Sequence, residues 1–317
     1  MDHISKTAIS LALSAGLAFA AVPVPGIAAD NAEPISSGAA ATALSAAPWT
    51  LERMEDAIPM PIPTLPRTGP ETKGGATPWV YTSYEIVPPV KALYKQKPYQ
   101  SVGKLFFHNP YNGLDYVCSA SIVNAPNRDT VWTAGHCVYE PELGYMQDWV
   151  FVPARFDRTN PYGTWTARNA WTLTGWTNGL LEYDMGAIVL NTGGPGGTYH
   201  VGVLGGFEFK ANIPRDQHFH ARGYPAAPPF SGERHHVCAT SWVTDDQPSG
   251  DPANPETLGV GCDMTGGSSG GPWIVDWGTA NYLNSNVSYG YSDAPNQYYG
   301  PYFGDAAQAL YNLASGN

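Results

Sequence analysis

Short apolar runs separated by turn residues fill the chain from about residue 98 to its end. Such runs, bounded by Gly, Pro and Asn, are typical of strands in a β-sandwich or β-barrel. The clearest of them are Ser101–Phe107, Tyr116–Val123, Thr130–Ala134, Trp149–Val152, Ala187–Leu190 and Trp273–Val275. The segment Asp305–Leu313 instead has helical spacing, with one apolar face made of Ala306, Ala309, Leu310 and Leu313. The sequence therefore predicts an all-β fold that ends in a helix.

The composition agrees with this fold class and narrows the possible partners. The 317 residues include 35 Gly and 29 Pro, and only 14% are charged, which is typical of a turn-rich β protein and not of a helical bundle. The formal net charge is −11 and no run of Lys or Arg occurs, which argues against nucleic acid as the natural partner. We expect a monomer that needs no cofactor.

The amino terminus has the features of a secretory signal peptide. Lys6 precedes an apolar stretch over residues 9–24, and small residues follow at Gly26–Ala29. The stretch is short for a membrane span and is interrupted by proline. We therefore predict a signal peptide over residues 1–29 and a secreted, extracellular protein without membrane contact after its removal. A retained amino-terminal anchor is the alternative.

Residues 30–97 differ from the rest of the chain. They are rich in Ala, Pro, Ser and Thr and show no lasting strand alternation, although Leu51–Ile58 could form one or two helical turns. Such a composition is typical of a pro-segment or a disordered linker. The predicted organisation is a signal peptide, this segment, and one domain over residues 98–317, whose halves cover about 98–197 and 198–317.

Four cysteines are spread along the domain without a C-x-x-C pair, so a zinc site is not expected. Pairing of sequence neighbours, Cys118 with Cys137 and Cys238 with Cys262, closes two loops of about 20 residues, each worth about 3 kcal/mol through loop entropy. Free buried thiols are the alternative. Because the amino terminus predicts secretion, we expect the two disulfides.

One loop places a serine among glycines, since residues 265–272 read TGGSSGGP. Glycine permits positive φ and close backbone approach. Such a loop can present a serine hydroxyl while backbone N–H groups converge on one point. That geometry suits a nucleophile with an oxyanion hole. A flexible Gly/Ser turn is the other interpretation of the same residues.

Two further residues have the chemistry that a serine nucleophile needs. His136 follows a predicted strand beside Cys137, and histidine is the natural proton acceptor for a serine hydroxyl near neutral pH. Asp184 precedes the apolar run Ala187–Leu190, where a buried carboxylate can accept the imidazole N–H. Taken alone, each residue is better explained by a structural role. Together they give the chain order His136, Asp184, Ser269.

That order is the one of the chymotrypsin type, whereas subtilisins and α/β-hydrolases use other orders. From about residue 98 onward the sequence resembles the chymotrypsin-like (trypsin-like) serine peptidases through three motifs: TAGHC at 133–137, the Asp184 strand, and GSSGGP at 267–272. The run TGGSS at 265–269 and the secretory start are similar to the secreted glutamyl-endopeptidase-like branch.

The resemblance implies two six-stranded antiparallel barrels with the active site between them. The first barrel would carry His136 and Asp184, and the second Ser269. Ser269 Oγ would attack the scissile carbonyl of a protein or peptide, His136 would carry the proton, and Asp184 would orient the imidazole. The N–H groups of Gly267 and Ser269 would hold the oxyanion. The resemblance also implies the disulfide from Cys137, beside the histidine, to Cys118.

Ser268 departs from the most familiar form of the motif, which has aspartate at this position. In that group the aspartate pairs with a new amino terminus after zymogen cleavage, so we do not expect this activation route here. A pro-segment would have to act in another way. Ser268 is also an alternative nucleophile, but the register G-x-S-G-G-P favours Ser269.

Three residues are candidates for substrate binding. Asp263 lies six residues before Ser269, where trypsins have the acid that selects Arg or Lys; a strand-end aspartate outside the pocket is the alternative. Ser288 and Gly290, in the run SYG, resemble the strand that pairs with the substrate backbone. Val287 stands where glutamate-selective relatives have histidine, so these residues do not support glutamate selectivity.

Four further histidines lie close together in the sequence: His218, His220, His235 and His236. A metal site needs a third convergent ligand with support from a second layer of residues, so we predict no metal here. Two alternatives to a serine endopeptidase are a catalytically silent relative that binds proteins or carbohydrate, and an esterase with the same triad. A silent relative usually lacks one of the three residues, whereas His136, Asp184 and Ser269 are all present.

Overall fold

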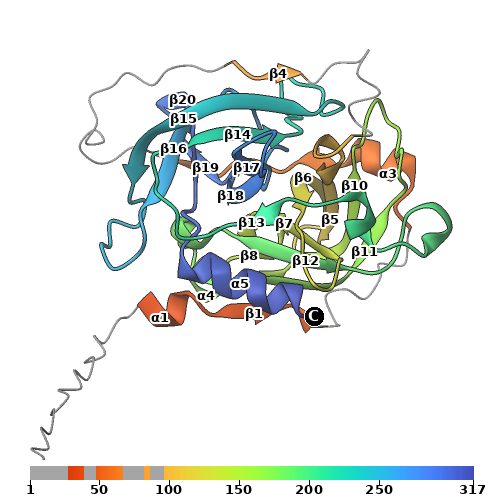
Figure 1. The fold of residues 1–317 in the computed structure, drawn as a ribbon, viewed down its shortest axis with the longest axis horizontal. Coiled ribbons are helices and arrows are strands. Elements are labelled where there is room, and N and C mark those ends of the chain that lie inside the picture. The colour runs from red at the N-terminus through yellow and green to blue at the C-terminus, as the bar shows by residue number, and fades with distance from the viewer. Residues whose placement is uncertain (1–27, 39–47, 67–81, 86–95) are drawn as a thin grey trace, which may run out of the picture.

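The computed structural model describes residues 28–38, 48–66, 82–85 and 96–317, and two β-sheets form most of this body (Figure 1). The predicted signal peptide lies outside the described residues, except for its last two. No helix in the described ranges has both the length and the apolar character needed to cross a membrane.

Six strands of the first sheet close into an antiparallel barrel. Their order is β11-β10-β5-β6-β7-β12, and β12 returns to pair with β11. The bounds are β5 (Val102–Asn109), β6 (Leu114–Ile122), β7 (Thr130–Thr133), β10 (Gln147–Pro153), β11 (Trp165–Leu173) and β12 (Gly186–Leu190). This closed barrel confirms the all-β prediction for the first half of the domain.

The continuous apolar runs arise because both faces of these strands are covered. On β12, Ile188 and Leu190 belong to the cluster inside the barrel. The alternate residues Ala187 and Val189 belong to a second cluster, which includes Leu310 of helix α5 (Asp305–Ser315). Successive side chains of a strand point to opposite faces, so a strand buried on both sides reads as an unbroken apolar run.

The second sheet forms an open path of strands within the described residues. Its order is β13-β18-β17-β14-β15-β16-β20-β19-β3, with β4 on β15. The bounds are β3 (Thr64–Leu65), β4 (Tyr84–Glu85), β13 (Glu208–Phe209), β14 (His218–Gly223), β15 (His236–Asp246), β16 (Thr257–Gly261), β17 (Pro272–Val275), β18 (Tyr282–Asn286), β19 (Tyr289–Tyr291) and β20 (Ala294–Gly300).

The predicted second barrel therefore lacks a closing strand pair within the described residues. The reason lies at Val287 and Ser288, which join β18 to β19. These two strands are consecutive in the chain, but β18 pairs with β17 whereas β19 pairs with β20. The sheet therefore ends with β13 beside β18 on one side and with β3 beside β19 on the other.

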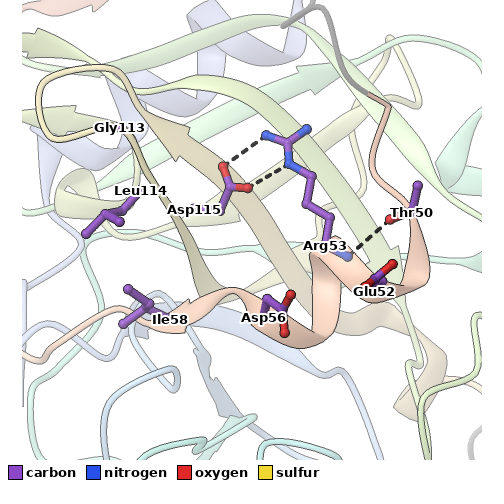
Figure 2. Close-up of a pocket in the computed structure, with 8 residues that line it drawn as sticks. All are labelled: Thr50, Glu52, Arg53, Asp56, Ile58, Gly113, Leu114 and Asp115. Carbon is purple, nitrogen blue, oxygen red and sulfur yellow. Dashed lines mark hydrogen bonds and ion pairs between the residues drawn. The ribbon is translucent and has the colours of Figure 1, made fainter.

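Part of the segment predicted as a pro-segment or linker belongs to the folded body. β1 (Pro34–Ser36) pairs with β11, and β2 (Ile58–Pro59) pairs with β6. Helix α3 (Leu51–Asp56) lies beside the first barrel, where Arg53 forms ion pairs of 2.7 Å with Asp115 and 2.8 Å with Asp148. Figure 2 shows Arg53 extending from α3 toward Asp115.

Short elements connect the strands. They are β8 (Tyr139–Glu140), β9 (Gly144–Tyr145), α1 (Ala28–Asn31), α4 (Thr174–Thr177) and the 3-10 turns Tyr99–Ser101, Gly135–Cys137, Leu181–Tyr183, Pro195–Gly197 and Val201–Leu204. Both predicted disulfides are present, Cys118–Cys137 in the first sheet and Cys238–Cys262 in the second. Each fixes a loop next to a strand end.

A buried serine on β6 joins the two sheets. Ser119 Oγ donates a hydrogen bond of 2.9 Å to the carbonyl of Gly267 and accepts one of 2.8 Å from the N–H of Tyr224. Its backbone N–H donates to the carbonyl of Ser269 at 2.8 Å. Ser121, two residues further along the same strand, is equally buried, but its hydroxyl has no partner within the described residues.

We predict that Ser119→Ala lowers the free energy of unfolding by about 1–3 kcal/mol, because it leaves two buried polar groups unsatisfied. Ser121→Ala is the matched control and should destabilise the protein less than Ser119→Ala does, because the Ser121 hydroxyl has no hydrogen bond to lose within the described residues. Urea unfolding followed by tryptophan fluorescence measures both. Equal effects of the two substitutions would contradict the bridging role of Ser119.

The carboxy-terminal helix is confirmed, but its buried face differs from the expected one. Ala307, Leu310 and Ala314 are buried, whereas Leu313 is 40% exposed. The sequence pattern also allows this face, and packing against the first sheet selected it.

We predict that Leu310→Ala costs about 2–5 kcal/mol of unfolding free energy, the usual range for a truncated core leucine. Leu313→Ala, on the same helix, should cost less than about 0.5 kcal/mol because its side chain is already in contact with water. Thermal and urea unfolding test the pair, and a larger loss at Leu313 would disprove this helix orientation.

Candidate active site

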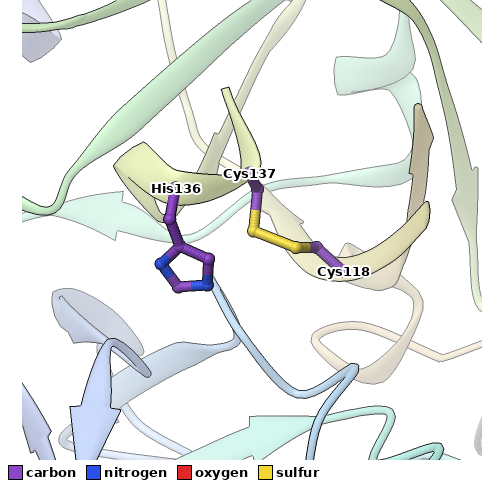
Figure 3. A group of neighbouring side chains, drawn as sticks. All are labelled: Cys118, His136 and Cys137. Atoms are coloured by element: carbon purple, nitrogen blue, oxygen red, sulfur yellow. A yellow bond between two sulfur atoms is a disulfide. The ribbon is translucent and has the colours of Figure 1, made fainter. Parts of the chain in front are cut away.

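His136 lies in a tight turn directly after β7. The turn Gly135–Cys137 is a 3-10 helix, and Cys137 ties it to Cys118 of β6 through a disulfide. Figure 3 shows the imidazole and the disulfide extending from neighbouring residues of this turn. A Cβ at Gly135 would come within 2.7 Å of the Trp176 ring, so only glycine lets the turn approach this closely.

Asp184 orients the imidazole through both carboxylate oxygens. Oδ1 accepts a 2.8 Å hydrogen bond from the backbone N–H of His136, and Oδ2 lies 2.8 Å from His136 Nδ1. Ser288 Oγ donates a third bond to Oδ2 at 2.5 Å. Because a carboxylate only accepts hydrogen bonds, Nδ1 carries the proton in this pair. The carboxylate is fully buried, and its charge is stabilised by these donors.

Two buried polar atoms nearby have no hydrogen-bond partner in the described part of the chain. They are His136 Nε2 and Ser269 Oγ. Buried polar atoms are normally paired, so such exceptions call for an explanation. With Nδ1 protonated, Nε2 of the neutral ring is an acceptor. The site therefore contains an unused acceptor and an unused hydroxyl donor.

The serine loop is held against the His136 turn. Gly270 donates its N–H to the Val287 carbonyl at 2.9 Å in the second sheet. On its other side, a Cβ at Gly270 would lie 2.1 Å from Thr133 Oγ1 and 2.6 Å from the Ala134 nitrogen. Its φ of +75° also favours glycine. Ser269 is thus fixed next to the strand end that leads to His136.

Ser268 and Ser269 differ in their hydroxyl contacts. Ser268 Oγ donates a 2.7 Å bond to the Thr265 carbonyl within the loop, whereas Ser269 Oγ has no partner among the described residues. The sequence register G-x-S-G-G-P also favours Ser269 over Ser268 as the candidate nucleophile. A hydroxyl already engaged inside its own loop is less available for attack.

The N–H of Gly267, a predicted oxyanion donor, makes a contact that the sequence did not indicate. It donates a 3.0 Å hydrogen bond to the carbonyl of Met60, in the segment before the domain. Gly267 has φ of +91°, which glycine adopts without the strain that other residues incur. The Met60 carbonyl thus accepts a hydrogen bond from the same Gly267 N–H that the sequence motif predicts as an oxyanion donor.

The three candidate substrate residues have different surroundings. Ser288 contacts the Asp184 carboxylate, and the N–H of Gly290 donates to the Pro63 carbonyl at 3.0 Å. Asp263 accepts a 2.7 Å bond from the Ser83 N–H. Asp263 is not among the described residues that line a cavity of about 430 Å³ beside Gly290 and Met264.

That cavity lies between the second sheet and residues 59–64. Its walls from the second half of the domain are Ala227, Met264, Thr265, Gly266, Gly290, Tyr291, Ser292, Ala294, Gln297 and Tyr298. None of these carries a formal charge at neutral pH. Burial raises the pKa of Tyr298, so its phenol stays protonated.

The four clustered histidines lie in different surroundings, from the exposed His218 to the fully buried His235. His220 stacks on Trp277, and burial, together with Arg222 and His218, lowers the pKa of His220 to about 4. Burial also holds the pKa of His235 well below its usual value. His218 contacts Ser241 Oγ at 3.0 Å. Low pKa values keep the partly buried ring of His220 and the fully buried ring of His235 neutral.

Sequence reasoning missed three contributors to the site: Met60, Ser119 and Trp176. Trp176 lies edge-on to the His136 ring at 6.1 Å. Each acts across a large sequence separation, and none belongs to a motif. A proline-rich run around Met60 was the only available signal, and its composition resembled a linker.

Comparison with known proteins gives matches of two kinds, while no family model matches the chain. Among curated proteins, an extracellular metalloprotease of Bacillus subtilis is 35% identical over 134 residues, which is 42% of this chain. A glutamyl endopeptidase of Bacillus licheniformis is 33% identical over 146 residues, or 45% of the chain. Each match spans 41% of the length of the curated relative.

Solved structures match over more of their length. The protease Anisep of Arthrobacter nicotinovorans is 38% identical with a TM-score of 0.63, covering 70% of this chain and 98% of Anisep. The thermostable serine protease AL20 of an extremophilic microorganism is 41% identical with a TM-score of 0.61, covering 69% of this chain and 98% of AL20. A Glu endopeptidase structure, 18% identical and covering 76% of this chain and all of its own, shares the fold with a TM-score of 0.58.

Identity above 30% across nearly the whole of two proteases, combined with the barrel topology, is decisive for the family. The chain belongs to the chymotrypsin-like (trypsin-like) serine peptidases, related to their glutamyl-endopeptidase branch.

Proposed function

We propose that the protein is a secreted serine endopeptidase in which Ser269, His136 and Asp184 form the catalytic triad. One observation carries the proposal. The Asp184 carboxylate holds the imidazole through two hydrogen bonds and leaves Nε2 free, while the buried Ser269 hydroxyl is also free within the described residues. A proton acceptor and a nucleophile that are both kept unpaired in a buried site fit acyl transfer.

In this mechanism His136 Nε2 takes the proton of Ser269 Oγ as the oxygen attacks the scissile carbonyl. The tetrahedral intermediate collapses to an acyl-enzyme, and the imidazolium gives its proton to the leaving amine. Water then attacks the acyl-enzyme with His136 again as the base. Asp184 stays ionised and stabilises the imidazolium, supported by the Ser288 hydroxyl.

The N–H groups of Gly267 and Ser269 are the proposed oxyanion donors. Preorganised donors of this kind typically contribute about 3 kcal/mol each to transition-state stabilisation. The positive φ of Gly267, +91°, supports this role, because glycine adopts it without strain in the tight loop that carries Ser269. The proposal also includes removal of residues 1–29 and action as a monomer on protein or peptide substrates.

A metal does not fit the close donor groups found among the described residues. The name of one curated relative specifies a metalloprotease. Within the described ranges, the two close groups of possible ligands are Cys118 with His136 and Cys137, and Cys238 with Cys262 and Asp263. Both contain cysteines already joined as disulfides, so no thiolate is available. The mechanism above therefore contains no metal step.

We predict that Ser269→Ala and His136→Ala each abolish reaction with a fluorophosphonate probe and reduce peptide hydrolysis by about 10⁴-fold or more. Ser268→Ala is the matched control. It should keep most of the activity, because its hydroxyl bonds within the loop. Each of the three variants is collected from the culture medium, and its reaction with the probe and its peptide hydrolysis are measured. Circular dichroism checks that each variant is folded. Labelling that survives Ser269→Ala would refute the assignment.

The substrate pocket in this proposal is the uncharged cavity beside Gly290. Met264 and Tyr298 provide apolar walls, and the Asp263 carboxylate is engaged by the Ser83 N–H. Placing a charged substrate side chain in such a cavity costs free energy unless an opposite charge meets it. We therefore propose a preference for uncharged, mainly apolar residues before the scissile bond.

A peptide-library cleavage profile tests this preference. Cleavage after apolar residues should exceed cleavage after Arg, Lys, Asp or Glu by about tenfold or more. Asp263→Asn should leave the profile unchanged. A dominant Arg/Lys preference that disappears in Asp263→Asn would instead assign Asp263 to the base of the pocket.

A further inference from the structure

A short segment before the domain crosses the candidate active site. Residues 59–65, called the strap here, contact three parts of the site through the backbone. Met60 donates its N–H to the Val117 carbonyl of β6 at 2.9 Å, and its carbonyl accepts from Gly267 at 3.0 Å. Further along, the Pro63 carbonyl accepts from Gly290 at 3.0 Å. The strap thus spans both sheets across the serine loop.

The strap runs parallel to both strands that flank the site. Pro59 pairs in parallel with Val117 of β6. Thr64 pairs in parallel with Gly290 of β19. The strap extends the open edge of the second sheet, where β3 is the last strand of the path. Addition of a strand to an exposed edge is a common mode of peptide recognition, since the edge supplies unpaired backbone groups.

Side chains of the strap share the substrate cavity. Ile62 is partly buried and packs against the apolar cluster that contains Met264 and Tyr298. Ile62 and Thr64 line the cavity from the strap side. Backbone pairing and a side chain set against the pocket wall are the two parts of peptide binding at a sheet edge.

The prolines of the strap favour this extended conformation. Pro59, Pro61 and Pro63 occupy alternate positions. Each fixes φ near the value of an extended chain and removes a backbone donor that would otherwise need a partner. A chain that is already extended loses less conformational entropy on binding.

Helix α3 holds the strap at high local concentration. Met54 of α3 is buried against the first barrel, and Arg53 bridges Asp115 and Asp148. Only a few residues separate α3 from Met60. A tethered ligand competes as if it were present at high effective concentration, so even weak contacts of the strap exclude a free peptide.

We propose that the strap is an internal ligand of the peptide-binding cleft and keeps the full chain inactive until it is displaced. The proposal rests on the serine endopeptidase function proposed above. While Gly267 donates to Met60, its N–H cannot stabilise an oxyanion formed from a substrate. Strand addition at Gly290 and part of the substrate cavity are blocked by the same segment.

The test uses two aspartate variants of the full chain with its pro-segment intact. Ile62→Asp places a charge against the uncharged cavity and should displace the strap. Ile58→Asp, just before the strap, is the matched control, because the Ile58 side chain is 41% exposed and aspartate stays hydrated there. Hydrogen exchange of the Met60 and Gly267 amides is measured in a Ser269→Ala background. Fluorophosphonate labelling is measured with Ser269 present.

We expect slow exchange at both amides in the chain without the aspartate changes and in Ile58→Asp. Ile62→Asp should speed exchange at both amides together and raise the labelling rate by about tenfold or more. Equal exchange at Gly267 in the two aspartate variants would overturn the proposal. So would labelling of the unaltered full chain at the rate of Ile62→Asp.

The two proposals fail in different ways. If Ile62→Asp releases both amides but no form of the protein reacts with the probe, the strap is supported as a ligand of the cleft and the serine nucleophile is refuted. If every form reacts at the same high rate, the nucleophile is supported and the blocking role of the strap is refuted.

Discussion

The buried carboxylate of Asp184 is the constraint on which the site depends. An ionised group without access to water is costly unless donors surround it. Two donors come from His136 in the first sheet, and the third is the Ser288 hydroxyl in the second. Asn286 adds a bond of 3.2 Å to the Asp184 main-chain carbonyl. Satisfying this one charge therefore requires the two sheets to dock in a single arrangement.

The serine loop uses the same junction between the sheets. Ser119 of β6 reaches the carbonyls of Gly267 and Ser269, and Gly270 fits against the strand that ends before His136. The proposed nucleophile, Ser269, is therefore positioned by backbone contacts, while its own hydroxyl makes no bond within the described residues. Rigid support together with a free reactive atom is the arrangement that acyl transfer requires.

Gly267 connects the serine loop to the amino-terminal segment. Its N–H is the donor assigned to the oxyanion, and Met60 accepts from it in this structure. A single N–H cannot fully serve both acceptors, so docking of the strap and stabilisation of a substrate oxyanion exclude each other. In the proposed function, this competition gives a chain with Ser268 in place of the usual aspartate a different route to delayed activity. In this proposal the strap acts directly on the cleft, without a new amino terminus.

The sequence by itself predicted several strands of the first sheet, the two disulfides and the terminal helix, and it singled out His136, Asp184 and Ser269 as candidate reactive residues, because each depends on local pattern or on a short motif. It did not determine the open second sheet, the exposed side of Leu313, the engagement of Asp263 by Ser83, or the contact between Met60 and Gly267. These four features depend on which segments, distant in the sequence, pack against each other, and the residue types alone do not indicate those contacts. Only the tertiary structure decided which polar atoms are paired and which remain free, and the chemistry proposed here follows from that distinction.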